Sequence, residues 1–172
     1  MLKSILDNLL ANLTPKPLTQ ESFAPFGDVI EVNDHAETRD INEGHTVRYH
    51  NLAKLNLGAN GGEPGVNIFR STPLKMPLQL RFMERHPLSS QAFMPLSGHP
   101  YLVVVAPPGD LIEADITVFL AEPYQGVNYQ AGTWHHYCLA LGDVSDFLVV
   151  DRIGDDENCD EVDLTETLTI NL

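Results

Sequence analysis

Apolar and polar residues alternate in short stretches along most of the chain, and Gly, Pro and Asn separate these stretches. Alternation with a period of two is typical of strands that bury one face. The pattern predicts strands over residues 28–32, 47–52, 66–70, 78–86, 91–96, 101–106, 116–121, 134–140 and 147–151. Many short strands with such punctuation favour a β-sandwich or a β-barrel.

Helical spacing occurs only near the start of the chain. Leucine and isoleucine residues between Met1 and Leu13 recur at helical intervals, which predicts a short amphipathic N-terminal extension that docks on the domain or on a second subunit. Thr19 to Phe23 predicts a capped helical turn. Residues 14–172 carry no linker or repeat, and their length suits one domain.

Composition limits the partners. A net charge of −14 over 172 residues repels phosphate backbones, so nucleic acid is excluded as a partner. No apolar run approaches the roughly 20 residues that cross a bilayer, which argues against a membrane protein. Cys138 and Cys159 lack metal or redox spacing, and a chain of this size folds without a disulfide. We therefore expect a cytoplasmic protein that acts on a small molecule.

The strand predicted over residues 78–86 ends in polar groups on its apolar face. Leu78, Leu80 and Phe82 share this face with Glu84 and His86. The opposite face carries Gln79, Arg81, Met83 and Arg85. A buried carboxylate and a buried imidazole must be hydrogen-bonded, bind a metal or line a wet pocket. We expect both groups to point into the barrel, and a satisfied ion pair is the structural alternative.

Two motifs extend this pattern. The spacing Glu84-x-His86-x4-Gln91-x6-Gly98, followed by Gly132-x-x-His135, resembles the two cupin motifs. Glu84, His86, Gln91 and His135 stand at the four positions of the cupin metal ligands, with Glu84 in place of a His and Gln91 in place of a Glu. The resemblance implies a mostly-β, double-stranded β-helix barrel with short peripheral helices. It also implies that these four side chains converge and could hold a divalent metal.

Longer phrases resemble one family more closely. Among them are Phe26-Gly27-Asp28-Val29-Ile30-Glu31, Gln125-Gly126-Val127-Asn128-Tyr129 and Trp134-His135-His136, with further matches in order between Leu18 and Asp160. They are similar to ureidoglycolate lyases of allantoin and purine degradation. This resemblance implies a homodimeric cupin that is a carbon–nitrogen (amidine) lyase, splits ureidoglycolate into glyoxylate and urea, and is associated with a divalent metal such as nickel.

That reaction needs one base and one acid, for which His86, His135 and Glu84 are the candidates and Gln91 is their neighbour. The substrate also carries a carboxylate, which an Arg can hold with two parallel hydrogen bonds. Val66, Ile68 and Arg70 share a face, and we expect Arg70 to end an inward row and bind this carboxylate. Arg48 is the second candidate, and Lys75 lies in a turn that could cover the barrel mouth.

Two other functions fit the same residues. One is a different metal-dependent cupin enzyme, and the other is a non-catalytic cupin that binds a small carboxylate. The acidic stretch over residues 151–163 lacks the ligand pattern of a calcium loop, and we expect it to be a solvated surface segment.

Overall fold

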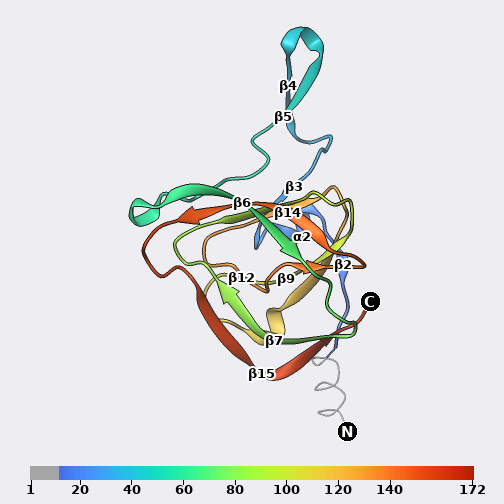
Figure 1. Ribbon diagram of the computed structural model, residues 1–172, viewed down its shortest axis with the longest axis vertical. Helices are drawn as coiled ribbons and strands as arrows, with labels where there is room; N and C mark the ends of the chain where they lie inside the picture. Colours follow the sequence, from blue (N-terminus) through green and yellow to red (C-terminus); the bar gives the residue numbers. More distant parts are fainter. Residues whose placement is uncertain (1–11) are drawn as a thin grey trace.

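The computed structural model describes residues 12–172, and the predicted mostly-β barrel is confirmed for this part of the chain (Figure 1). The larger sheet contains, in spatial order, β1 (Asn12–Leu13), β15 (Asp160–Ile170), β7 (Leu78–Arg85), β12 (Trp134–His135), β9 (Tyr101–Ala106), β10 (Thr117–Ala121) and β2 (Lys16–Pro17), while β13 (Leu139–Ala140) also pairs with β9. The second sheet contains β3 (Gly27–Ile30), β11 (Gly126–Tyr129), β8 (Gln91–Pro95), β14 (Ser145–Ile153) and β6 (Glu63–Ser71).

The remaining elements lie at the periphery. Helix α2 (Gln20–Phe23) is the predicted capped turn, and Thr19 and Ser22 form its capping box. Three 3₁₀ turns are η1 (Asn42–Gly44), η2 (Ala59–Gly61) and η3 (Glu113–Asp115). Strands β4 (Glu37–Ile41) and β5 (Thr46–His50) pair only with each other and form a hairpin that projects from the barrel (Figure 1). No helix among the described residues is long and apolar enough to cross a membrane.

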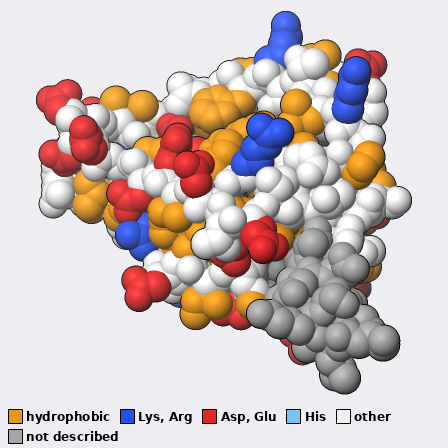
Figure 2. All heavy atoms as spheres, turned by 90° about the horizontal axis from the view of Figure 1, so that it is seen from below, with side chains coloured by type: hydrophobic (Ala, Val, Ile, Leu, Met, Phe, Trp, Pro, Cys, Tyr) orange, Lys and Arg blue, Asp and Glu red, His pale blue; other side chains and the backbone are white. Residues whose placement is uncertain are grey.

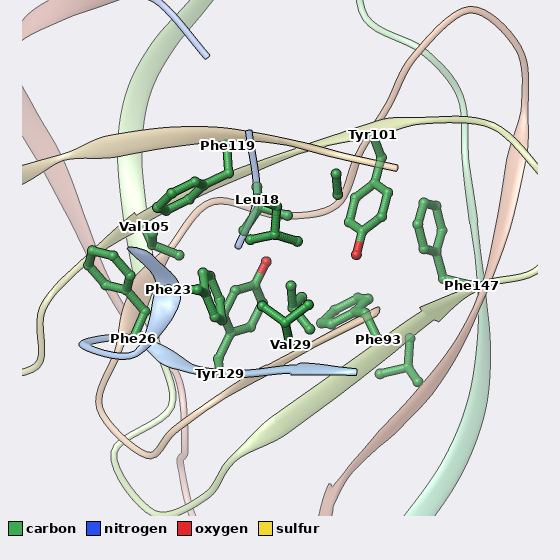
Figure 3. Packing of buried hydrophobic residues seen from close by; sticks show 14 of the residues in the cluster. Leu18, Phe23, Phe26, Val29, Phe93, Tyr101, Val105, Phe119, Tyr129 and Phe147 are labelled. Carbon is green, nitrogen blue, oxygen red and sulfur yellow. The ribbon is translucent and has the colours of Figure 1, made fainter. Parts of the chain in front are cut away.

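Strand β9 explains how the two cores are organised. Tyr101, Val103 and Val105 face an aromatic core between the sheets, which Figure 3 shows with Phe23, Phe93, Phe119, Tyr129 and Phe147. The alternate residues Leu102, Val104 and Ala106 belong to a second core with residues of β7 and β15. Both faces of β9 are therefore buried, which is why its sequence is apolar without interruption.

Several strand predictions require correction. The structure adds β4, β11 and β15, of which β15 has 11 residues and begins inside the acidic stretch that we expected to be a solvated surface segment. The predicted strand over residues 134–140 is broken into β12 and β13. Of the predicted N-terminal extension, residues 1–11 lie outside the described residues, and Asn12–Leu13 form β1, which pairs with β15.

The predicted division of β7 into a buried and an exposed face holds only in part. Leu78 and Leu80 are buried as expected, but Met83, which alternation assigned to the opposite face, is fully buried in the second core. The reason is tertiary, because Met83 belongs to the same core cluster as Trp134 of β12 and Val104 of β9, two strands that alternation along β7 cannot predict.

The surface reflects the acidic composition. On the face shown in Figure 2, Asp and Glu side chains lie in several groups among apolar side chains, and Lys and Arg are few. This distribution agrees with the net charge of −14.

Candidate functional site

The strand pair β7–β12 brings the central site residues together. Glu84 and His135 are cross-strand partners, and His86 follows Glu84 by two residues just beyond the end of β7. Potential ligand atoms of Glu84, His86 and His135 all lie within 4.8 Å of one another. The side chain of His135 is only 2% exposed, and that of Glu84 is 19% exposed. This triad of Glu84, His86 and His135 is therefore closed to solvent at His135 and open to solvent at Glu84.

Hydrogen bonds to main-chain carbonyl groups determine which ring nitrogen of each imidazole carries the proton. His86 Nδ1 lies 2.6 Å from the carbonyl oxygen of Asn158, and His135 Nδ1 lies 3.1 Å from that of Thr133. Since a carbonyl oxygen can only accept, each Nδ1 must carry the proton that it donates. The neutral form of each ring therefore presents an Nε2 lone pair.

The lone pair of His135 faces a carboxylate. His135 Nε2 is buried without a hydrogen-bond partner, and it lies 3.6 Å from Glu84 Oε1. Burial lowers the pKa of His135 to about 3, and the neighbouring His86 lowers it further as a smaller cause. Burial also raises the pKa of Glu84, partly offset by His86. Two electron-rich atoms at this distance repel each other, so a proton on Glu84 or a cation between them would relieve the repulsion.

The triad rests on the aromatic core. The ring of Tyr129 stacks on His135 with centroids 4.4 Å apart and planes 14° apart, and Tyr129 in turn contacts Phe93. This packing limits the imidazole to one orientation. Gly132 supports the other side of the site, because its positive φ of 79° forms the turn before β12 and its N–H donates to the carbonyl oxygen of His86.

Gln91 lines the barrel from the opposite sheet. It pairs with Tyr129 across β8 and β11, and its Nε2 lies 3.5 Å from Asp151 Oδ2. Asn67 donates to the other oxygen of the same carboxylate over 2.9 Å. Gln91 therefore faces the interior, where Asp151 and Asn67 orient its amide.

The acidic stretch is less uniform than we expected. Asp155, Asp156 and Glu157 are exposed, but Asp151 faces the barrel and Asn158 is hydrogen-bonded to His86. Cys159 and Glu161 also come within ligand distance of Glu84. The solvated-segment prediction fails at Asp151 and Asn158, because the chain turns back along β7 and passes the triad, whereas Cys159 and Glu161 are exposed.

The expected inward orientation of Arg70 is wrong. Val66 and Ile68 are 70% and 56% exposed, so their face of β6 points outward, and Asn67 faces the barrel instead. The side chain of Arg70 is 73% exposed, and its guanidinium makes two hydrogen bonds to Asp146, of 2.8 and 2.9 Å. β6 is an edge strand, and its outer face carries exposed apolar residues. The usual rule that apolar side chains mark the inner face of a strand therefore selects the wrong face here.

The other two basic candidates also lie apart from the triad. Arg48 is exposed on the projecting hairpin, opposite Arg39. Lys75 is exposed in the loop that precedes β7, whereas Glu84 is near the other end of that strand. Neither side chain extends the set formed by Glu84, His86 and His135.

Sequence reasoning missed three residues that support the site. Tyr129 could have been found, because it follows the apolar alternation of the stretch from Gly126. Asp151 and Asn158 gave no signal of their own, since 60 residues separate Asp151 from Gln91 and 72 separate Asn158 from His86. Only the tertiary fold brings these pairs together.

Comparison with known proteins agrees with this geometry. The family model "Ureidoglycolate lyase" matches residues 10–171. A curated relative of that name from Burkholderia mallei (strain NCTC 10229) is 52% identical over 92% of this chain and 93% of its own length. Another, from Stutzerimonas stutzeri (strain A1501), is 49% identical over 91% of this chain and 92% of its own length.

Among solved structures, a dTDP sugar isomerase from Desulfovibrio desulfuricans G20 matches with a TM-score of 0.45 and 12% identity, over 80% of this chain and 85% of that chain. The family match spans nearly the whole described chain, including every residue of the triad. This chain belongs to the ureidoglycolate lyase family.

Proposed function

We propose that this protein cleaves ureidoglycolate into glyoxylate and urea, as a carbon–nitrogen lyase of allantoin and purine degradation. The observation that carries the proposal is the buried, unpartnered Nε2 of His135 facing Glu84 beside His86. The names of relatives that are about 50% identical over most of the chain agree with it. It also fits the earlier expectation that the protein acts on a small molecule.

The reaction is an elimination without a redox step. The hydroxyl group loses its proton, its oxygen forms the carbonyl of glyoxylate, the carbon–nitrogen bond breaks, and the nitrogen of the departing urea gains a proton. The Nε2 lone pair of His86 takes the hydroxyl proton. Glu84 suits the acid step, because burial raises its pKa and so favours the protonated carboxyl group, whose proton can pass to the leaving nitrogen.

The same residues fit a divalent transition metal. Two imidazoles with free Nε2 atoms and one carboxylate are the ligand types that such ions bind, and Gln91 is a further oxygen donor facing the barrel. Glu84, His86 and His135 would hold the ion, and their lone pairs would then serve as metal ligands in place of the proton transfers described above. When bound, it would supply Lewis-acid polarisation of the substrate oxygens. It would also provide a positive charge that attracts a carboxylate, a role that the outward-facing Arg70 does not fill.

We further propose that the protein is a homodimer in the cytoplasm. Exposed Val66 and Ile68 form an apolar row on an edge strand, and Ile41 and Val47 are exposed on the projecting hairpin. Apolar groups of this kind favour contact with a second copy. Cys138 and Cys159 are both free thiols, which suits a reducing compartment.

The decisive experiment measures urea and glyoxylate release from ureidoglycolate, with metal content determined on the same untagged preparation. We expect wild-type protein to release both products in equal amounts. His135→Gln should reduce the rate by about 10²–10⁴-fold, because it removes the Nε2 lone pair that faces Glu84, the proposed acid, while it keeps a polar side chain of similar size. His99→Gln is the matched control, since His99 contacts Ser145 away from the triad.

Other outcomes separate the alternatives. No product from wild-type protein that nevertheless binds glyoxylate would favour the non-catalytic carboxylate-binding cupin. Wild-type turnover by His135→Gln would refute the assignment of the triad as the site.

A further inference from the structure

We propose that Asn158 is the positioning residue of the site, which holds the His86 imidazole in a single orientation and tautomer. The inference rests on the proposed function only for its effect on rate. Asn158 lies in the turn before β15, and its neighbours Glu157 and Cys159 are exposed while its own side chain is half-buried. Of these three residues, Asn158 is thus the one whose side chain is turned toward the barrel.

Three hydrogen bonds join Asn158 to the segment that carries His86. Its carbonyl oxygen accepts from His86 Nδ1 over 2.6 Å. Its side-chain Oδ1 accepts from the main-chain N–H of Leu88 over 2.7 Å, and its Nδ2 donates to Ser89 Oγ over 2.9 Å. One residue therefore binds both the imidazole and the turn that follows it.

Different groups hold the main chain and the ring of His86. The main chain of His86 is held independently, because its carbonyl oxygen accepts from the N–H of Gly132 over 2.9 Å. The ring depends on the carbonyl of Asn158, and the position of this carbonyl depends on the side chain of the same residue. An Nδ1–H bond to a fixed acceptor leaves Nε2 as the free atom, which is the atom that a base or a ligand requires. Loss of the Asn158 side chain should release the ring without dismantling the barrel.

The test combines histidine nuclear magnetic resonance with steady-state kinetics on the full chain as purified. In wild-type protein labelled with ¹⁵N at histidine, long-range ¹H–¹⁵N spectra should show His86 with the proton on Nδ1, and His86→Gln identifies the signal. In Asn158→Ala, the signal should become an average of both tautomers. The kcat should fall by roughly tenfold to a hundredfold, with KM changed by less than about twofold.

Two further variants distinguish a positioning role of Asn158 from a general loss of structure. Asn158→Asp keeps the Oδ1 acceptor for Leu88, so it should retain the Nδ1–H tautomer and more of the activity than Asn158→Ala. Asn33→Ala is the matched control, because Asn33 also accepts from one main-chain N–H (His35) and donates to a neighbouring oxygen (Glu31), outside the barrel. It should leave both the His86 spectrum and kcat unchanged.

An unchanged His86 tautomer in Asn158→Ala would overturn the proposal, as would an equal loss of kcat in Asn33→Ala. The tautomer spectrum needs no substrate. If wild-type protein released no glyoxylate, the proposed function would fail while the positioning role of Asn158 would still be decided by the spectra.

Discussion

His135 and His136 are adjacent and both buried, but their side chains have different surroundings. His135 stacks on Tyr129 and faces Glu84, whereas His136 packs against Phe82 with ring centroids 5.0 Å apart. Burial lowers the pKa of His136 to about 4 and that of His135 to about 3. Folding therefore keeps both rings neutral at pH values where the unfolded chain binds protons.

The lowered pKa of His136 in the folded protein predicts how the free energy of unfolding depends on pH. Between pH 6.5 and about 4, unfolded His136 gains a proton that the folded protein lacks, so the free energy of unfolding should fall as the pH is lowered. His136→Gln should reduce this slope by up to one proton, or about 1.4 kcal/mol per pH unit. Urea unfolding at a series of pH values measures it.

The comparison must be made between variant and wild type, because the raised pKa of Glu84 contributes with the opposite sign in part of this pH range. Val118→Ala is the control, since it weakens the core without removing a titratable group and should keep the wild-type slope. If His136→Gln kept that slope as well, His136 would not be the proton acceptor in unfolding.

At the scale of elements, the pair β3–β11 sets the position of Tyr129 and hence of His135. Gly27 is the cross-strand partner of Tyr129, and its φ of 150° suits glycine. A Cβ atom there would lie 1.8 Å from the carbonyl oxygen of Asn128. The two strands can therefore approach as closely as they do only because this position has no side chain.

Gly27→Ala should lower the free energy of unfolding by about 3 kcal/mol or more, because backbone atoms must move to admit the methyl group. Glyoxylate release should fall too, since β11 carries Tyr129. Urea unfolding measures the stability, and Gly58→Ala is the matched control with nothing within 4 Å of its Cβ. Equal, small losses in both variants would show that β3 can shift freely against β11.

At the scale of the whole molecule, the outer face of the second sheet and the hairpin that projects from the barrel in Figure 1 share one property. Both expose apolar residues that an isolated chain leaves in water. An isolated two-stranded hairpin is at best marginally stable in water, so its extension from the barrel suits contact with another chain. The proposed homodimer gives both features a partner.

Replacement of Val66 and Ile68 together by Asp should raise the dimer dissociation constant by about a hundredfold or more, because two carboxylates would have to be desolvated at the interface. Sedimentation velocity over a range of concentrations measures this change. Ile112→Asp is the control, as Ile112 is 57% exposed in the loop between β9 and β10 of the larger sheet. Wild-type protein that sediments as a monomer throughout would contradict the dimer, and a double variant that stays dimeric would exclude this face.

The sequence by itself determined the features that depend on local pattern. Period-two alternation predicted most strands, the capping residues predicted α2, and the spacing from Glu84 to His135 identified the three residues that the structure brings together. The strand and helix predictions succeed because side-chain direction along a strand and hydrogen bonding at a helix start follow from neighbouring residues alone.

Only the tertiary structure decided which face of each strand is buried and which distant residues support the site. The outward face of β6, the burial of Met83 and the breaking of the 134–140 strand depend on what covers each element. Asn158 reaches His86, and Asp151 reaches Gln91, because strands far apart in sequence curl into one barrel. Long-range pairing of this kind leaves no trace in local alternation, since any polar residue in the turn would fit the pattern equally well.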